Sequence, residues 1–96
     1  MPLYYMETAR ATVRNMLLGA RQTAAESKPK PIRSFVDLTA REVHKAWIGS
    51  LRPNRMRMAC QAMRQLKIDV DEVLEQPPKG DGPRLRIRFY LDYWPR

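Results

Sequence analysis

Four polar side chains on one predicted helix could form hydrogen bonds to the edges of nucleobases. They follow one another at intervals of three, four and three residues, which places them on one face of an α-helix. The guanidinium group of arginine suits guanine, and the amides of asparagine and glutamine suit adenine. We therefore predict base contacts in double-stranded DNA by Asn54, Arg57, Gln61 and Arg64.

Basic side chains around this helix face could neutralise phosphates. No acidic residue lies between Glu42 and Asp69, although a solvated helix face usually mixes both signs and gains ion pairs at i, i+4 spacing. The alternative is an ordinary exposed face, because arginine and glutamine are good helix formers. The predicted phosphate contacts are Arg52, Arg55, Lys67, Lys79, Arg84, Arg86 and Arg88.

The net charge of the chain favours an anionic partner. Its 96 residues carry 18 Lys and Arg against 10 Asp and Glu, which gives +8 at pH 7, and the isoelectric point is near 10.3. A chain of this length forms one domain with a modest core. The charge fits nucleic acid, an anionic membrane surface or an acidic protein, and the remaining interpretation is a protein that is merely soluble and basic.

Several functional classes are disfavoured. A single cysteine excludes an internal disulfide. We see neither a signal peptide nor an apolar run of the roughly 20 residues that a membrane helix needs, so a cytoplasmic location is expected. The only histidine, His44, has no convergent partners, and the acids at 69, 71, 72 and 75 have no nearby His or Cys. We predict no enzymatic activity, metal or cofactor.

The first half of the chain predicts a long helix, a linker and a short strand. Residues 7–25 form the helix, residues 26–34 are a proline-containing linker, and the loose alternation from Ser34 to Leu38 predicts the strand. The apolar stripe of the helix has spacings of three and four. It consists of Leu3, Met6, Ala9, Val13, Met16, Leu17, Ala20 and Ala24.

A helix pair follows. Thr39 and Glu42 have the spacing of a capping box, which predicts a helix start. This helix directs Val43, Ala46 and Trp47 inward and ends near Gly49, and residues 50–52 form a turn. The next helix begins at Pro53 or Asn54 and runs to about Leu66. Its expected buried stripe is Met56, Ala59, Cys60, Met63 and Leu66, with Cys60 as a small core residue.

The last third predicts a hairpin. Residues 68–76 and 84–91 are the strands, residues 77–83 form a Gly/Pro loop, and residues 92–96 are a tail. In the second strand Leu85, Ile87, Phe89 and Leu91 alternate with the outward Arg84, Arg86, Arg88 and Tyr90. The arginine row has a second interpretation, since opposite charges on paired strands stabilise hairpins. Its partners would be Asp69, Asp71, Glu72 and Glu75.

Over residues 7–91 this order of elements resembles the winged helix-turn-helix family. The resemblance rests on element order, the capping box at 39–42, the turn at 49–53 and the loop at 77–83, whereas the loose turn and the long first helix depart from the family. It implies an α+β fold with three helices packed on a small two- to three-stranded antiparallel sheet. Residues 39–67 would be the helix-turn-helix and residues 68–91 the wing, with Lys79 at its tip.

The resemblance implies a recognition helix within residues 52–67 that lies in the major groove, and a homodimer formed through the first helix or through Tyr93 and Trp94. We expect sequence-preferring binding of double-stranded DNA by a small transcriptional regulator or mobile-element accessory factor. One alternative is an RNA or single-strand binder that stacks bases on Tyr90. The other is a protein-interaction module that uses Met58, Tyr93 and Trp94.

Overall fold

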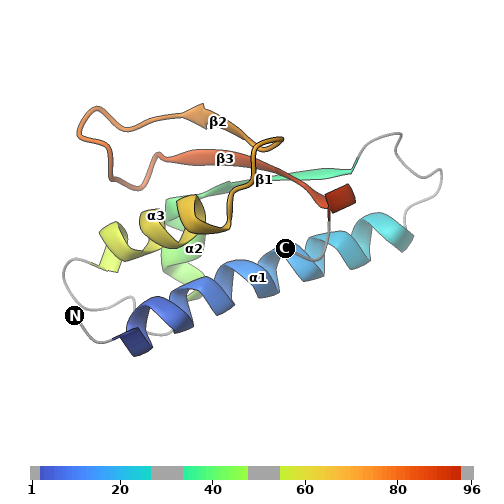
Figure 1. The fold of residues 1–96 in the computed structure, drawn as a ribbon, viewed down its shortest axis with the longest axis horizontal. Coiled ribbons are helices and arrows are strands. Elements are labelled where there is room, and N and C mark those ends of the chain that lie inside the picture. The colour runs from blue at the N-terminus through green and yellow to red at the C-terminus, as the bar shows by residue number, and fades with distance from the viewer. Residues whose placement is uncertain (1–2, 27–33, 48–54, 94–96) are drawn as a thin grey trace.

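The computed structural model describes residues 3–26, 34–47 and 55–93. Within these ranges the chain forms three α-helices, three strands and one 3-10 helix, so the predicted α+β class is confirmed. In Figure 1 the three helices lie together on one side of the sheet. The elements are α1 (Leu3–Glu26), β1 (Phe35–Thr39), α2 (Ala40–Ala46), α3 (Arg55–Leu66), β2 (Glu72–Glu75), β3 (Arg86–Tyr90) and the 3-10 helix η1 (Leu91–Tyr93).

Helix α1 begins four residues before the predicted start at Glu7 and runs along the other two helices. Ala9, Val13 and Leu17 on its apolar stripe are fully buried, and four more residues of the stripe pack partly buried against the core. Gly19 lies within the helix without ending it. The stripe was therefore predicted correctly from Met6 to Ala24.

The predicted capping box starts α2. The Thr39 hydroxyl accepts a hydrogen bond from the Glu42 backbone N–H (3.1 Å), and the Glu42 carboxylate accepts one from the Thr39 backbone N–H (3.1 Å). The helix is shorter than expected, because it ends at Ala46 and buried Trp47 is its capping residue. Ala46 is exposed, which corrects the prediction that it points inward. The predicted helix end and turn at 48–52 lie outside the described residues.

Helix α3 buries more of its surface than one stripe. Ala59, Cys60, Met63 and Leu66 are buried as predicted. Met56 is only partly buried. Because α3 packs against both α1 and α2, residues on its flanks are also enclosed. These flanking residues are Arg55, Met58 and Ala62.

The sheet is antiparallel with strand order β1-β3-β2, so the third strand in the chain lies between the first two. Leu38 lies opposite Ile87, and Val73 lies opposite Ile87 from the other side. The inward row Leu85, Ile87, Phe89 and Leu91 is buried as predicted and closes the core on the helices.

The first strand of the predicted hairpin is shorter than residues 68–76. Residues 68–71 form a turn instead, in which the Asp71 backbone N–H bonds the Ile68 carbonyl (3.0 Å). The Asp71 carboxylate accepts from the Ile68 backbone N–H at 2.9 Å and from the Tyr90 backbone N–H at 2.8 Å. Asp71 is 3% exposed and therefore joins this turn to β3, which its place in an acidic cluster did not predict.

Candidate nucleic-acid interface

The exposed face of α3 carries three of the four side chains predicted to contact bases. The Arg57 side chain is 72% exposed, and Gln61 and Arg64 are half-buried. The face forms because the opposite side of α3 carries alanines, Cys60 and methionines that enter the core. Asn54 lies outside the described residues.

The β2–β3 loop (residues 76–85) is bound to this face of α3. Arg64 Nη1 lies 2.6 Å from Asp81 Oδ1, and Arg64 Nη2 donates to the Gly80 carbonyl. Arg57 Nε lies 3.9 Å from the other oxygen of the same carboxylate. Gly80 has a φ of +87°, a left-handed conformation that glycine adopts without strain. Two of the predicted base-contacting cations therefore already face an acid.

Cys60 joins the loop to α3 from the core side. Its Sγ lies 3.4 Å from both the backbone nitrogen and the carbonyl oxygen of Gly82, so the thiol can accept one hydrogen bond and donate another. Burial raises the pKa of the Cys60 thiol, which keeps it in the neutral form that can donate. Cys60 is a buried core residue as predicted, and it also positions the loop.

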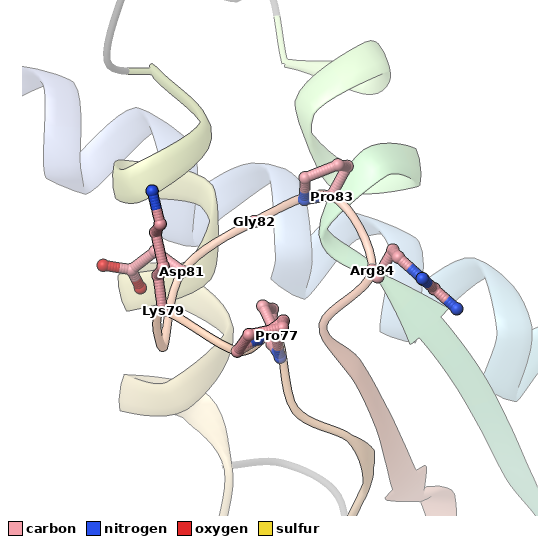
Figure 2. A pocket seen from close by; sticks show the side chains of 7 residues that line it. Pro77, Lys79, Asp81, Gly82, Pro83 and Arg84 are labelled. Atoms are coloured by element: carbon pink, nitrogen blue, oxygen red, sulfur yellow. The ribbon is translucent and has the colours of Figure 1, made fainter.

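Figure 2 shows that the charged side chains of the β2–β3 loop point to two different sides of the loop. Lys79 and Asp81 lie on the side of α3, whereas Arg84 points the opposite way. Pro77, Pro78 and Pro83 line an apolar hollow of about 280 Å³ between these two sides. Lys79 is exposed at the tip of the loop, where a phosphate could reach it. The loop therefore presents cations on both of its sides.

The prediction that Arg55 contacts phosphate is wrong in this structure. Arg55 is only 7% exposed, and its guanidinium carbon lies 5.6 Å from the centre of the Trp47 ring. Its Nη1 donates to the Met58 sulfur at 3.4 Å. Met58 is itself 5% exposed, which contradicts its predicted role as an exposed contact for a protein partner.

The arginine row predicted for the second hairpin strand is divided among three environments, and its first member, Arg84, lies in the β2–β3 loop before β3 begins. Arg84 Nε bonds the Glu75 carboxylate at 2.9 Å, so this arginine pairs with one of the acids suggested, although the bond joins the loop to β2 and does not join two strands. Arg88 instead bonds Asp37 of β1 through two nitrogens at 2.8 and 3.1 Å, and these hydrogen bonds raise the pKa of Arg88 above its ordinary value. Arg86 is exposed and makes no ion pair with any described residue.

The Arg88 guanidinium also lies over the Phe35 ring, 4.1 Å from its centre, and Tyr90 meets the same ring edge-on. The Tyr90 hydroxyl donates to Glu72 at 3.1 Å. Tyr90 is half-buried and contacts both Phe35 and Glu72, so part of its side chain is already used and is not available for the stacking on bases that the single-strand alternative requires.

Lys67 is half-buried, and its Nζ donates to the Ile68 carbonyl at 3.2 Å. Arg52 lies outside the described residues. The sequence-based reasoning missed Asp81 as the partner of Arg64, because the two residues are 17 positions apart. A single acid within a basic region was the only signal that could have identified it.

Within the described ranges, none of the helices combines the length and apolarity that crossing a membrane requires. In the same ranges, no three side chains of His, Cys, Asp or Glu are grouped to hold a metal ion. Neither a protein-family model, nor a curated protein, nor a solved structure matched the chain.

Proposed function

We propose that this protein binds double-stranded DNA with a sequence preference, as a winged helix-turn-helix domain. Helix α3 is the proposed major-groove reader, and the β2–β3 loop is the proposed wing. The observation that carries the proposal is the face of α3, on which exposed Arg57 and half-exposed Gln61 adjoin a loop tipped by exposed Lys79. The described part of α3 contains no acidic residue that would repel phosphate.

The arrangement of elements supports the same proposal. One helix, one strand, two helices and two strands follow in order, and β3 lies between β1 and β2. The order of these elements along the chain is the one on which the resemblance to the winged helix family rests. A small transcriptional regulator or mobile-element accessory factor in the cytoplasm, acting as a homodimer through α1 or through Tyr93 and Trp94, remains the proposed biological setting.

The experiment that tests this function is anisotropy with duplexes selected from a randomised pool, measured across a salt series. We expect Arg57→Ala/Gln61→Ala to weaken binding to the selected duplex about tenfold or more, because each good base contact contributes about 1–3 kcal/mol of discrimination. Binding to a scrambled duplex should change less, so the sequence preference should fall.

The matched control is Arg14→Ala/Gln22→Ala, which removes the same two residue types from exposed positions of α1. This control should retain the sequence preference. Equal losses in the two double variants, or no binding of the wild-type protein at low salt, would exclude α3 as the reading helix.

A second candidate function, protein interaction, is favoured by one observation. Val70, Val73 and Leu74, in and beside the edge strand β2, are 40–43% exposed. The backbone groups of a sheet edge can bind an added strand, and exposed apolar side chains beside that edge give the added strand further contacts. Stable oligomers in sedimentation experiments that are lost on Val73→Lys, together with no DNA binding, would favour this function.

A further inference from the structure

A second concave site lies beyond the β2–β3 loop, where β1 continues into α2. It is a hollow of about 410 Å³, and the arginines Arg41, Arg84 and Arg86 line it together with Glu42 and Glu75. Its walls are held to one another by backbone hydrogen bonds, from Ala40 N–H to the Leu85 carbonyl (2.9 Å) and from Arg41 N–H to the Pro83 carbonyl (3.2 Å).

The charges around this hollow are unequal. Three arginines face two carboxylates, and both carboxylates already accept hydrogen bonds from neighbours within the protein. Glu42 accepts from the Thr39 backbone N–H and hydroxyl at 3.1 and 3.0 Å, and Glu75 accepts from Arg84. Arg41 and Arg86 are exposed and form no ion pair with any described residue. Two guanidinium groups are therefore available to a ligand.

Guanidinium groups donate pairs of hydrogen bonds in a planar fork that matches phosphate and carboxylate oxygens. Arg41 of α2 and Arg86 of β3 line the hollow from different elements, and a tetrahedral phosphate suits donors on separate walls better than a planar carboxylate, because its oxygens point in more directions. We propose that the hollow between Arg41, Arg84 and Arg86 binds a phosphate group.

This site is separate from the face of α3. Figure 2 shows Arg84 directed away from Lys79 and Asp81, so a phosphate held at Arg84 does not compete for the cations beside α3. The proposal therefore stands whether or not α3 binds DNA. The phosphate could belong to the backbone of a nucleic acid or to a small phosphorylated compound, and the two sources are distinguished below.

The first test is a titration with inorganic phosphate, followed by NMR of the backbone amides and arginine Nε–H groups. We expect saturable shifts at Arg41, Arg84 and Arg86, smaller shifts with acetate, and none with sodium chloride at matched ionic strength. Arg41→Gln/Arg86→Gln should weaken phosphate binding about tenfold. Arg14→Gln/Arg21→Gln, which removes the same charge from exposed positions of α1, should leave binding unchanged.

Shifts that do not saturate, or that are equal in the two double variants, would overturn the proposal. Thermal unfolding of Arg41→Gln/Arg86→Gln checks that the variant remains folded, as expected for exposed side chains. The source of the phosphate follows from duplex DNA added in phosphate-free buffer. Shifts of the same amides and a loss of DNA affinity in Arg41→Gln/Arg86→Gln would assign the site to the nucleic-acid backbone. Phosphate binding without a DNA response would assign it to a small phosphorylated compound.

Discussion

At the scale of single residues, Asp81 forms ion pairs with two arginines, Arg57 and Arg64, that the proposed function requires for contacts with DNA. Its carboxylate lies 2.6 Å from Arg64 and 3.9 Å from Arg57. Carboxylate and phosphate oxygens accept the same charge-assisted hydrogen bonds from a guanidinium group, so DNA must compete with Asp81 for these donors. Both side chains of the Arg64–Asp81 pair are 34% exposed, and a partly solvated pair contributes at most about 1 kcal/mol to stability.

We therefore expect Asp81→Asn to strengthen DNA binding severalfold and to steepen its dependence on salt, because two cations become available to phosphates. The measurement is anisotropy across a salt series. Asp69→Asn makes the same charge change at an exposed residue and controls for net charge. Weaker binding by Asp81→Asn than by Asp69→Asn would mean that Asp81 positions Arg64 for DNA and does not compete with it.

At the scale of elements, the short helix α2 depends on its cap. A helix of seven residues has few internal hydrogen bonds, and the Thr39 hydroxyl satisfies one of its exposed backbone N–H groups. The same residue ends β1, lies opposite Arg86 and lines the phosphate hollow. The cap therefore fixes where the sheet stops and the helix pair begins.

We expect Thr39→Ala to lower the free energy of unfolding by about 1 kcal/mol, the usual effect of losing a side-chain cap. Chemical denaturation measures this change. Thr23→Ala in α1 is the control, because the Thr23 hydroxyl donates to the Gly19 carbonyl inside a long helix and caps no orphan N–H. Alanine is a better helix former than threonine, so the control should be neutral or slightly stabilising. Equal destabilisation by the two variants would contradict the capping argument.

Local patterns were the part of this structure that the sequence could predict. The capping box joins Thr39 to Glu42, three positions further along the chain, and the alternation of β3 repeats every two residues, so both depend on near neighbours. Burial on the flanks of α3 could not be predicted, because a stripe assumes one covered side and α3 packs against both α1 and α2.

The partners of the charged site residues were also beyond the sequence. Arg88 bonds Asp37 across 51 positions, whereas the sequence predicted a phosphate contact for Arg88 and offered the acids of the adjacent hairpin strand as the alternative partners. The pairing follows from β1 lying beside β3, which only the assembled sheet reveals. The role of Arg41 was missed for the same reason, since the hollow it lines is formed by residues from distant parts of the chain.

At the scale of the whole molecule, the net charge of +8 lowers the stability of the folded state and raises the affinity for a polyanion such as DNA. Self-repulsion destabilises the folded state, and salt screens it. Salt also weakens contacts with phosphates. Helix α1, about 36 Å long at 1.5 Å per residue, spans most of the 42 Å longest dimension and carries exposed arginines along it.

We expect the melting temperature to rise and the affinity for DNA to fall between about 0.01 M and about 0.15 M salt, over which the Debye length shortens from about 30 Å to about 8 Å. Differential scanning calorimetry and anisotropy in the same buffers measure the two quantities. A melting temperature that falls over this range would mean that ion pairs such as Arg88–Asp37 outweigh the self-repulsion.

The central position of β3 in the sheet has a consequence for synthesis on the ribosome. Strands β1 and β2 both pair with β3 in the described sheet, and both precede it in the chain. Neither can complete this pairing until β3 has emerged, so the sheet closes only after nearly all of residues 35–90 have been translated. Before that point both strands have unpaired backbone groups. Unpaired strands of this kind can pair with other chains and aggregate, which is why molecular chaperones bind such intermediates. We therefore expect the helices to form and pack against one another first, and the sheet to form as the final step.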